Sequence, residues 1–490
     1  MTARQPPAPE TTAPESTADG ASTALPLTGR ILILSRDPAL LDAQLAGASL
    51  SLDQAAPLRD EVSTDEITPV AILSHYDDRL GRYAYTGFQA GGRCPLGPDA
   101  ARHGGFSVTV AGGRYGKGSS REHSPAAEKL AGIRLVIAES FERIYRQNAD
   151  NIGLFTSTDF GLIERIQRGE AIPVDELVAG RDALAAAILK SGGLLRFGQQ
   201  HLRNVRPAEP TVPTADDGKA AAAMAGAAAS DDAVVPQTLF EKIVARHALR
   251  TPVTPTHAAV GEGLFVCADR RFIHEYYTGM AAHMLQATLG DALALHEPAS
   301  IVVFEDHTSY IHTSPAHVRL GLVPNVLAMC QAQRDFAARF GLTLHRTLTD
   351  EEAAQEDRDF AAGRSKGGRN VAGISHAMVT EHYALPGQIV AGTDSHTPHS
   401  GALGCVAFGV GTTDMANAFV TGAVRLTMPA SLKIELNGTL PPGLTAKDIV
   451  LHLLALPAIR AGAGVGKVLD RKSTRLNSSH IQKSRMPSSA

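Results

Sequence analysis

The segment that most constrains the fold is residues 106–138. It begins with FSVTV (106–110), which alternates as a half-buried strand does, and ends with RLVIA (134–138), an apolar run typical of a buried strand. Between them a glycine-rich turn leads into SPAAEKLAG, a short helix that we expect Gly132 to end. A strand, loop, helix and strand in this order indicate an α/β layer.

The rest of the chain divides around two low-complexity stretches. Residues 1–27 are rich in Pro, Thr, Ala and Ser and predict a disordered arm, and residues 206–236, an alanine run flanked by Pro and Asp, predict a linker. We therefore expect one α/β domain at 28–205 and a second at 237–469. Residues 470–490 have no periodicity and resemble translated adapter sequence, so we expect this tail to be non-native.

Apolar runs within both domains predict their further elements. The expected strands are ILIL (31–34), VAIL (70–73), the start of IVVFEDH (301–307), GQIVAGTDSHT (387–397) and the residues from 434 onward. The expected helices are a long one around 316–341, a Gly/Ala-rich one after 397, and one that begins at Thr445.

Composition and charge exclude several classes of function. Lys plus Arg number 46 and Asp plus Glu number 50, so the net charge of −4 predicts no nucleic-acid partner and no membrane partner. No apolar run reaches the roughly 18–20 residues that span a bilayer. The four cysteines form no CxxC pair and the N-terminus lacks a signal-peptide core, which together predict a cytoplasmic protein without a disulfide framework.

The turn GRYGKGSSREH (113–123) has the features of an anion site. Ser119 and Ser120 precede a helix whose free N–H groups favour negative charge, and Arg121 adds a bidentate fork for a carboxylate or phosphate. A Walker A loop would need Ser or Thr after the lysine, but Gly118 follows Lys117. A capped helix with a solvated arginine remains the structural alternative.

Histidines and aspartates gather near the predicted strand ends of the second domain. Asp306 and His307 follow one strand, and His376 precedes the strand that leads to the Asp394–Ser395–His396 trio. Ligands of α/β sheets bind at such ends, and a carboxylate beside a histidine can orient it for proton transfer. A surface turn or a core histidine is the alternative for each. Ser395 lies in T-D-S-H-T and lacks the G-x-S-x-G elbow, which disfavours a serine hydrolase.

Taken together these motifs resemble the aconitase superfamily. GSSREHSPAAEKLAG and RDEVSTDEITP (59–69) resemble its swivel domain, most closely that of the 3-isopropylmalate dehydratase (isopropylmalate isomerase) family. EDH, GISH, GTDSHTPHSGALG and NGTLPPGLTAKDIV resemble the family's catalytic large subunit. The resemblance covers most of residues 59–160 and 270–468. It implies an α/β fold with a swivelling β/α domain linked to a three-layer α/β/α catalytic domain that is incomplete at its C-terminal end.

The same resemblance implies an iron–sulfur hydro-lyase that dehydrates and rehydrates a hydroxy-di- or tricarboxylate at a [4Fe-4S] cluster. Ser120 matches the base, and Ser119, Arg121 and Ser395 match substrate-binding positions. The other matches to catalytic positions are Asp65, Asp306, His307, His376, Asp394 and His396. Leucine biosynthesis through 3-isopropylmalate is the expected role. The alternatives are aconitase, homoaconitase, methylcitrate or 2-methylmalate chemistry, and a non-catalytic aconitase-like RNA binder.

Two departures from the family pattern carry their own expectations. The swivel-like domain precedes the catalytic one, so no separate small subunit should be needed. None of Cys94, Cys267, Cys330 and Cys405 fits the family's cluster ligands, and we interpret Cys405 as a packing residue at the start of a helix. The cluster cysteines are therefore expected beyond the end of this chain, which leaves no metal ligand within it and predicts that this fragment is inactive.

Overall fold

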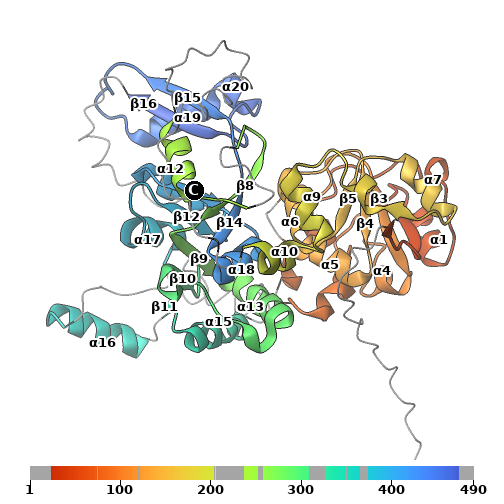
Figure 1. Cartoon of the computed structure of the whole chain (residues 1–490), viewed down its shortest axis with the longest axis horizontal. Coiled ribbons are helices and arrows are strands. Elements are labelled where there is room, and N and C mark those ends of the chain that lie inside the picture. The colour runs from red at the N-terminus through yellow and green to blue at the C-terminus, as the bar shows by residue number, and fades with distance from the viewer. Residues whose placement is uncertain are drawn as a thin grey trace, which may run out of the picture.

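The computed structural model describes residues 24–73, 75–118, 122–202, 205, 237–251, 258–307, 320, 326–347, 350–364 and 373–473. The predicted linker and most of the predicted arm and tail lie outside these residues. Figure 1 shows the described residues of 24–205, in red to yellow, beside those of 237–473, in green to blue; they are called the front half and the back half below. In the described part of the chain, no helix combines the length and apolar character that crossing a bilayer requires.

A four-stranded parallel sheet forms the centre of the front half. Its order is β2-β3-β4-β5, and its strands are β2 (Arg30–Ile33), β3 (Phe106–Ala111), β4 (Leu135–Ala138) and β5 (Phe155–Ser157). Adjacent residues point to opposite faces, so Leu32 and Val136 join one hydrophobic core while Ile33 and Ile137 join another. The strands predicted at 31–34, 106–110 and 134–138 are thereby confirmed.

Helices cover both faces of this sheet. On one face lie α4, α5 and α6, and on the other lie α7, α8 and α9. The helices of the front half are α1 (Pro38–Leu45), α2 (Leu52–Ala55), α3 (Thr64–Ile67), α4 (Ala100–His103), α5 (His123–Ala131), α6 (Arg143–Ile152), α7 (Gly161–Gln167), α8 (Val174–Leu177), α9 (Ala183–Lys190) and α10 (Leu194–His201). Helix α5 ends at Gly132 as predicted, because this residue adopts the left-handed conformation (φ 109°) that closes helices.

Two predictions for the front half were wrong. VAIL (70–73) is not a strand: Val70–Ile72 form the 3₁₀ helix η1, whose backbone bonds are local, and the side chain of Val70 is exposed. A second 3₁₀ helix, η2 (Asp78–Tyr83), follows it. The predicted disordered arm reached residue 27, but β1 (Ala24–Leu25) pairs with β6 (Ile172–Pro173), which places Leu25 in the core.

A five-stranded sheet in which every strand pair is parallel forms the centre of the back half. Its order is β11-β10-β9-β12-β13, and its strands are β9 (Arg270–His274), β10 (Ile301–Phe304), β11 (Thr343–His345), β12 (Ile389–Gly392) and β13 (Val406–Gly409). All carboxyl ends therefore meet at one edge. Separate cores on its two faces confirm an α/β fold. The Gly/Ala-rich segment after residue 397 is not one helix: η5 (Thr397–Leu403), Cys405 and β13 come before the next α-helix.

The remaining elements of the back half surround this sheet. An antiparallel sheet of order β14-β8-β7 contains β7 (Ala248–Leu249), β8 (Gly263–Cys267) and β14 (Ala423–Thr427). The helices are α12 (Leu239–His247), α13 (Glu275–Leu289), η3 (Gly290–Ala292), η4 (Pro298–Ser300), α15 (Val326–Phe340), α16 (Asp350–Ala361), α17 (Ser375–His382) and α18 (Thr412–Thr421). Helix α15 occupies much of the range 316–341, whose first part lies mainly outside the described residues.

A small unit ends the described chain. β15 (Ser431–Leu436) pairs in parallel with β16 (Val468–Ser473), and α19 (Ala446–Ala455) and α20 (Pro457–Arg460) connect them. Helix α19 begins after Thr445, whose side chain and that of Asp448 form the capping box, so the predicted strand and Thr-started helix are confirmed. Strand β16 extends to residue 473, past the boundary at 470 that the tail prediction set.

The two halves share a hydrophobic core. Phe197 and Leu194 of α10 pack with Phe265 of β8, and the Phe197 and Phe265 rings stack with centroids 5.7 Å apart. Helix α9 takes part in two cores: Leu184 and Ile188 contribute to the shared core, while Leu189 packs in the core of the front half. Apolar burial therefore joins the halves along α9 and α10.

Candidate active site

The candidate site lies at the carboxyl edge of the five-stranded sheet. His274 ends β9, Asp306 and His307 follow β10, and Asp394 comes two residues after β12. These three strands are neighbours, with Phe304 beside His274 and Gly392 beside Phe272 in the register. A Cβ atom added to Gly392 would lie 2.2 Å from the Phe272 ring, so the turn into Asp394 requires glycine here.

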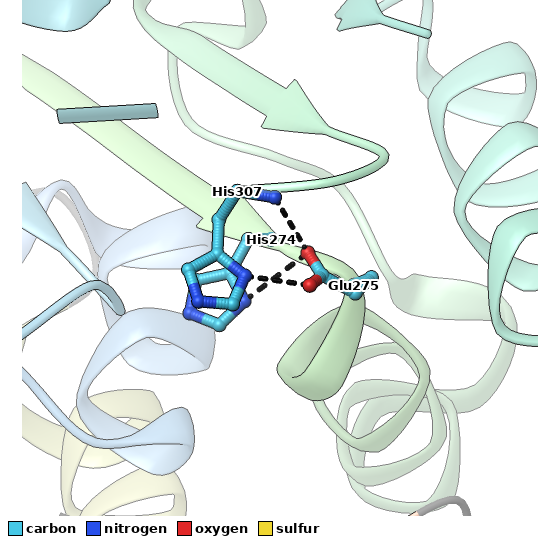
Figure 2. A group of neighbouring side chains, drawn as sticks. All are labelled: His274, Glu275 and His307. Carbon is cyan, nitrogen blue, oxygen red and sulfur yellow. Dashed lines mark hydrogen bonds and ion pairs between the residues drawn. The ribbon is translucent and has the colours of Figure 1, made fainter. Parts of the chain in front are cut away.

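The first group in the site is a buried glutamate that contacts two stacked histidines (Figure 2). Glu275 opens α13, and its Oε1 lies 2.5 Å from Nδ1 of His307, while its Oε2 accepts the His307 backbone N–H at 3.0 Å and lies 3.4 Å from Nδ1 of His274. The two imidazole rings stack with centroids 4.0 Å apart. Figure 2 shows both Nε2 atoms together on the side away from Glu275. The carboxylate thus fixes both ring orientations.

Charge is distributed unequally over this group. Burial raises the pKa of Glu275, but its interactions with His274 and His307 outweigh burial and hold that pKa at about 2. Burial also opposes the charge on His307, yet the Glu275 hydrogen bond and charge leave its pKa raised. For His274, burial and the neighbouring His307 leave the pKa lowered. The group therefore favours an ionised Glu275, a protonated His307 and a neutral His274.

The second group repeats this arrangement around Asp394. Its Oδ2 lies 3.0 Å from Nδ1 of His376 and accepts a hydrogen bond from the Ser375 hydroxyl at 2.7 Å. Its Oδ1 accepts the backbone N–H of His396 at 2.8 Å and lies 3.2 Å from Nδ1 of the same residue. Burial raises the pKa of Asp394, but these contacts, led by that of His376, outweigh burial and hold it well below its usual range.

A third histidine completes the second group. The ring of His376 lies 4.9 Å from that of His396, almost parallel to it, and 5.4 Å from that of His399, at 60°. Burial and the neighbouring His376 lower the pKa of His399. The charge of Asp394 also acts on His274 and His307, so the two groups form one electrostatic unit.

The front half reaches this edge through the start of α5. The ring of His123 lies 6.0 Å from that of Tyr277, which lies 4.9 Å from the ring of His274. The side chain of Glu122 accepts a hydrogen bond from the Thr413 backbone N–H at 2.9 Å. Residues that are more than 150 positions apart in the sequence are thus brought to one place.

The structure brings some of the predicted site residues together, places others at the surface, and does not describe three of them. It brings His307, His376, Asp394 and His396 together, and Asp306 lies buried beside His307. Ser395 is exposed, with its hydroxyl 3.3 Å from Nδ1 of His396. Asp65 is exposed on α3, a helix joined to α5 by the Ser124 hydroxyl, which donates to the Thr64 carbonyl at 3.0 Å. Ser119, Ser120 and Arg121 lie outside the described residues.

Sequence reasoning missed three residues of the site. His274 and Glu275 follow RRFI, which contains two arginines and two apolar residues, and His399 stands three residues after His396. The available signal was the His-Glu pair itself, because RRFI lacks the continuous apolar run that marked the strand before Asp306 and His307. It became informative only once β9 was placed between β10 and β12.

The chain's cysteines do not fit an iron–sulfur cluster. All four lie within the described residues: Cys94 is in the front half, Cys267 ends β8, Cys330 is on α15, and Cys405 donates to the Leu385 carbonyl at 3.1 Å. Burial raises the pKa of Cys267, Cys405 and Cys330, the last to about 12, and so disfavours the thiolates that iron requires. Among the described residues, only the histidine–carboxylate groups hold three or more donor atoms within 4.8 Å of one another.

Two family models match the chain. The model of the aconitase family (aconitate hydratase) matches residues 241–470, which include both histidine–carboxylate groups. The model of the aconitase C-terminal domain matches residues 98–158, which include β3 to β5 of the front half. The domain named for its C-terminal position thus precedes the catalytic match in this chain.

Named relatives agree with these matches. The 3-isopropylmalate dehydratase large subunit of Roseiflexus castenholzii is 31% identical over 241 residues, 48% of this chain and 44% of that protein. The chloroplastic large subunit of Arabidopsis thaliana is 26% identical over 49% of this chain and 42% of its own length. The chain therefore spans less than half the length of these relatives.

A solved structure is similar to a shorter part of the chain. A 3-isopropylmalate dehydratase structure from Methanocaldococcus jannaschii shares 29% identity and covers 29% of this chain and 88% of its own, with a TM-score of 0.22. Family models of the aconitase superfamily thus match both halves of the chain, over residues 98–158 and 241–470.

Proposed function

We propose that this chain acts in a hydro-lyase that removes water from a hydroxy-polycarboxylate and adds it back, with 3-isopropylmalate as substrate. The family match and the names of the large-subunit relatives support the reaction class and the substrate. The observation that carries the proposal is the pair of groups at the sheet edge. In each, one buried carboxylate orients two stacked imidazole rings.

This pair of groups suits the proton transfers of dehydration. His307 has a raised pKa and is held by Glu275, so it can give a proton to a leaving hydroxyl. His376 and His396 turn Nδ1 toward Asp394 and leave Nε2 for a water molecule or a substrate oxygen. In this proposal Ser120 removes the proton next to a substrate carboxylate, Ser119, Arg121 and Ser395 bind carboxylates, and Asp65 and Asp306 assist.

Family membership implies an iron–sulfur cluster in general terms, and its chemistry would be Lewis-acid binding of the substrate hydroxyl. Because this chain's cysteines do not fit such a cluster, no proton transfer above is assigned to it. We propose that the [4Fe-4S] cluster of the intact enzyme is held by residues other than Cys94, Cys267, Cys330 and Cys405.

The proposal also assigns roles to the two halves. Residues 28–205 take the part of the swivel or small subunit, and residues 237–469 take that of the large subunit. The match at 98–158 and the contacts of Glu122 and His123 with the back half support this division. A separate small subunit would then be unnecessary.

Solvent-exchange NMR tests the proposed activity. The intact enzyme that contains these residues and its cluster is incubated with 3-isopropylmalate in D₂O. We expect loss of water to a conjugated alkene and, when water is added back, deuterium at the carbon that lost its proton. His307→Asn should abolish both signals, whereas His103→Asn, a change of a histidine on α4 of the front half, should leave them intact. Absence of both signals from the intact wild-type enzyme with its cluster in place would argue against the proposed reaction.

A further inference from the structure

Glu122 connects the two halves at the candidate site. It directly follows Ser119–Arg121 in the sequence and directly precedes α5, but its side chain makes no capping bond to its own helix. The residue is completely buried, and both carboxylate oxygens face α18 of the back half. Oε2 accepts the Thr413 backbone N–H at 2.9 Å, and Oε1 accepts the Thr413 hydroxyl.

The N-terminus of α18 depends on this carboxylate. Its N-cap residue is Gly411, which has no side chain to satisfy the first free N–H groups. A carboxylate from residue 122 takes that place and also complements the positive end of the helix dipole. A Cβ atom at Gly411 would lie 2.7 Å from Glu122 Oε2 and 2.5 Å from Asn148 Oδ1, so glycine is what allows the front half to come this close.

The contact lies beside the catalytic edge. Helix α18 follows β13, the strand next to β12, and a Cβ atom at Gly409 would lie 3.2 Å from the Asp394 carbonyl oxygen. One residue further along α18, Asp414 accepts hydrogen bonds from Asn151 at 2.7 Å and Gln147 at 3.2 Å, both on α6. The start of α18 is thus bonded to Glu122, which directly precedes α5, and to α6 of the front half, while Gly409 at the end of β13 packs close to the Asp394 carbonyl.

We propose that Glu122 is a positioning residue of the proposed hydro-lyase: its carboxylate caps α18 across the two halves and so holds the start of α5 at the helix that follows β13, the strand beside Asp394. The catalytic part of this role rests on the proposed function, but the contact between Glu122 and α18 can be measured without turnover. Glu122 acts through Thr413 and α18 and touches none of the catalytic histidines in the described structure.

Amide hydrogen exchange of the full chain tests the contact, and two adjacent threonines supply a matched pair of variants. Thr413→Val removes the hydroxyl that donates to Glu122, whereas Thr412→Val removes a buried hydroxyl without a hydrogen-bond partner. We expect Thr413→Val and Glu122→Ala to speed exchange at the start of α18 and of α5 by about tenfold to a hundredfold, the range for a lost buried hydrogen bond. Glu122→Gln should restore part of the protection, and Thr412→Val should leave it unchanged.

Peptides from β3 and β4 report whether the front half stays folded in each variant. Unchanged exchange at the start of α18 in both Glu122→Ala and Thr413→Val would overturn the proposal, as would an equal effect of Thr412→Val. In protein that turns over 3-isopropylmalate, Thr413→Val should lower kcat more than it changes KM, because the misplaced groups act in the chemical step. Loss of turnover in the wild type would count against the proposed function and would leave the exchange result intact.

Discussion

Replacing Glu275 with glutamine tests the charge distribution of the candidate site. The pKa of Glu275 is about 2, against an ordinary value of 4.5, although the side chain is buried. At about 1.4 kcal/mol per pKa unit, the net shift favours the ionised form by about 3 kcal/mol, after the opposing effect of burial is included. Because the substituted glutamine would carry no charge, the two largest contributions that oppose burial would be lost or weakened, and only the smaller effects of Asp394 and Asp306 would remain. We therefore expect the pKa of His307 to fall.

The sign of the stability change follows from linkage. A histidine with a raised folded-state pKa contributes stability that is fully present below the unfolded pKa of about 6.5 and lost as pH rises through the folded pKa. In Glu275→Gln this contribution of His307 should be lost. The free energy of unfolding at pH 6 should therefore fall by about 1–3 kcal/mol, the range for losing a buried hydrogen bond to a charged group. The depressed pKa of Glu275 itself adds stability that is lost only as pH falls from about 4.5 toward 2.

Histidine NMR measures the effect directly. The Cε1–H resonance of His307, assigned by its loss in His307→Asn, is followed from pH 5 to 9 in the wild type and in Glu275→Gln. Glu305→Gln is the matched control, since Glu305, directly after β10, is also buried but contacts Arg334 and the Thr347 backbone rather than His307. A His307 pKa that stays raised in Glu275→Gln would refute the assignment of its charge to this glutamate.

Three further predictions follow from other contacts. Asp394→Asn should free the ring of His376 and lower kcat about a hundredfold or more in active protein, with KM less affected, as steady-state kinetics would show. Burial raises the pKa of Glu122 to about 7, so this group's contribution to stability is present below pH 4.5 and is lost as pH rises to 7. Urea unfolding of Glu122→Gln between pH 5 and 7 should lack that slope, and an unaltered slope would contradict it. Phe265→Ala should cost about 3–5 kcal/mol in the shared core and lower the Tm of both halves together, whereas separate transitions would show that the halves unfold independently.

His307, His376, Asp394 and His396 were predicted as site residues, and all four lie in the two histidine–carboxylate groups, but the sequence did not show which of them contact one another. His376 and Asp394 were expected at one rim, and the structure joins them by a hydrogen bond, because both flank β12. Apolar runs identified β4 and β10, since buried parallel strands are continuous apolar runs. Alternation identified β3, although every residue of that strand is buried. Local sequence pattern was therefore sufficient to predict strands and the polar residues that directly flank them.

Other features depended on packing that no local pattern records. His274 and Glu275 gain their role because β9 lies between β10 and β12, an order that differs from the order along the chain. The VAIL run is as apolar as a strand, yet it follows Pro69 and forms backbone bonds within its own turn. The cap that Glu122 gives to α18 spans 291 positions and is invisible to any windowed pattern.

Helix α9 has a mechanical consequence for any opening of the site. Its Leu189 is embedded in the front core and its Leu184 and Ile188 in the core shared with β8 and β14. A movement of the front sheet relative to the back half must therefore carry α9 with it and disturb the packing of Leu184 and Ile188 with Phe265. Opening the site by such a movement would expose part of this core to water, and its free-energy cost would rise with the apolar area exposed.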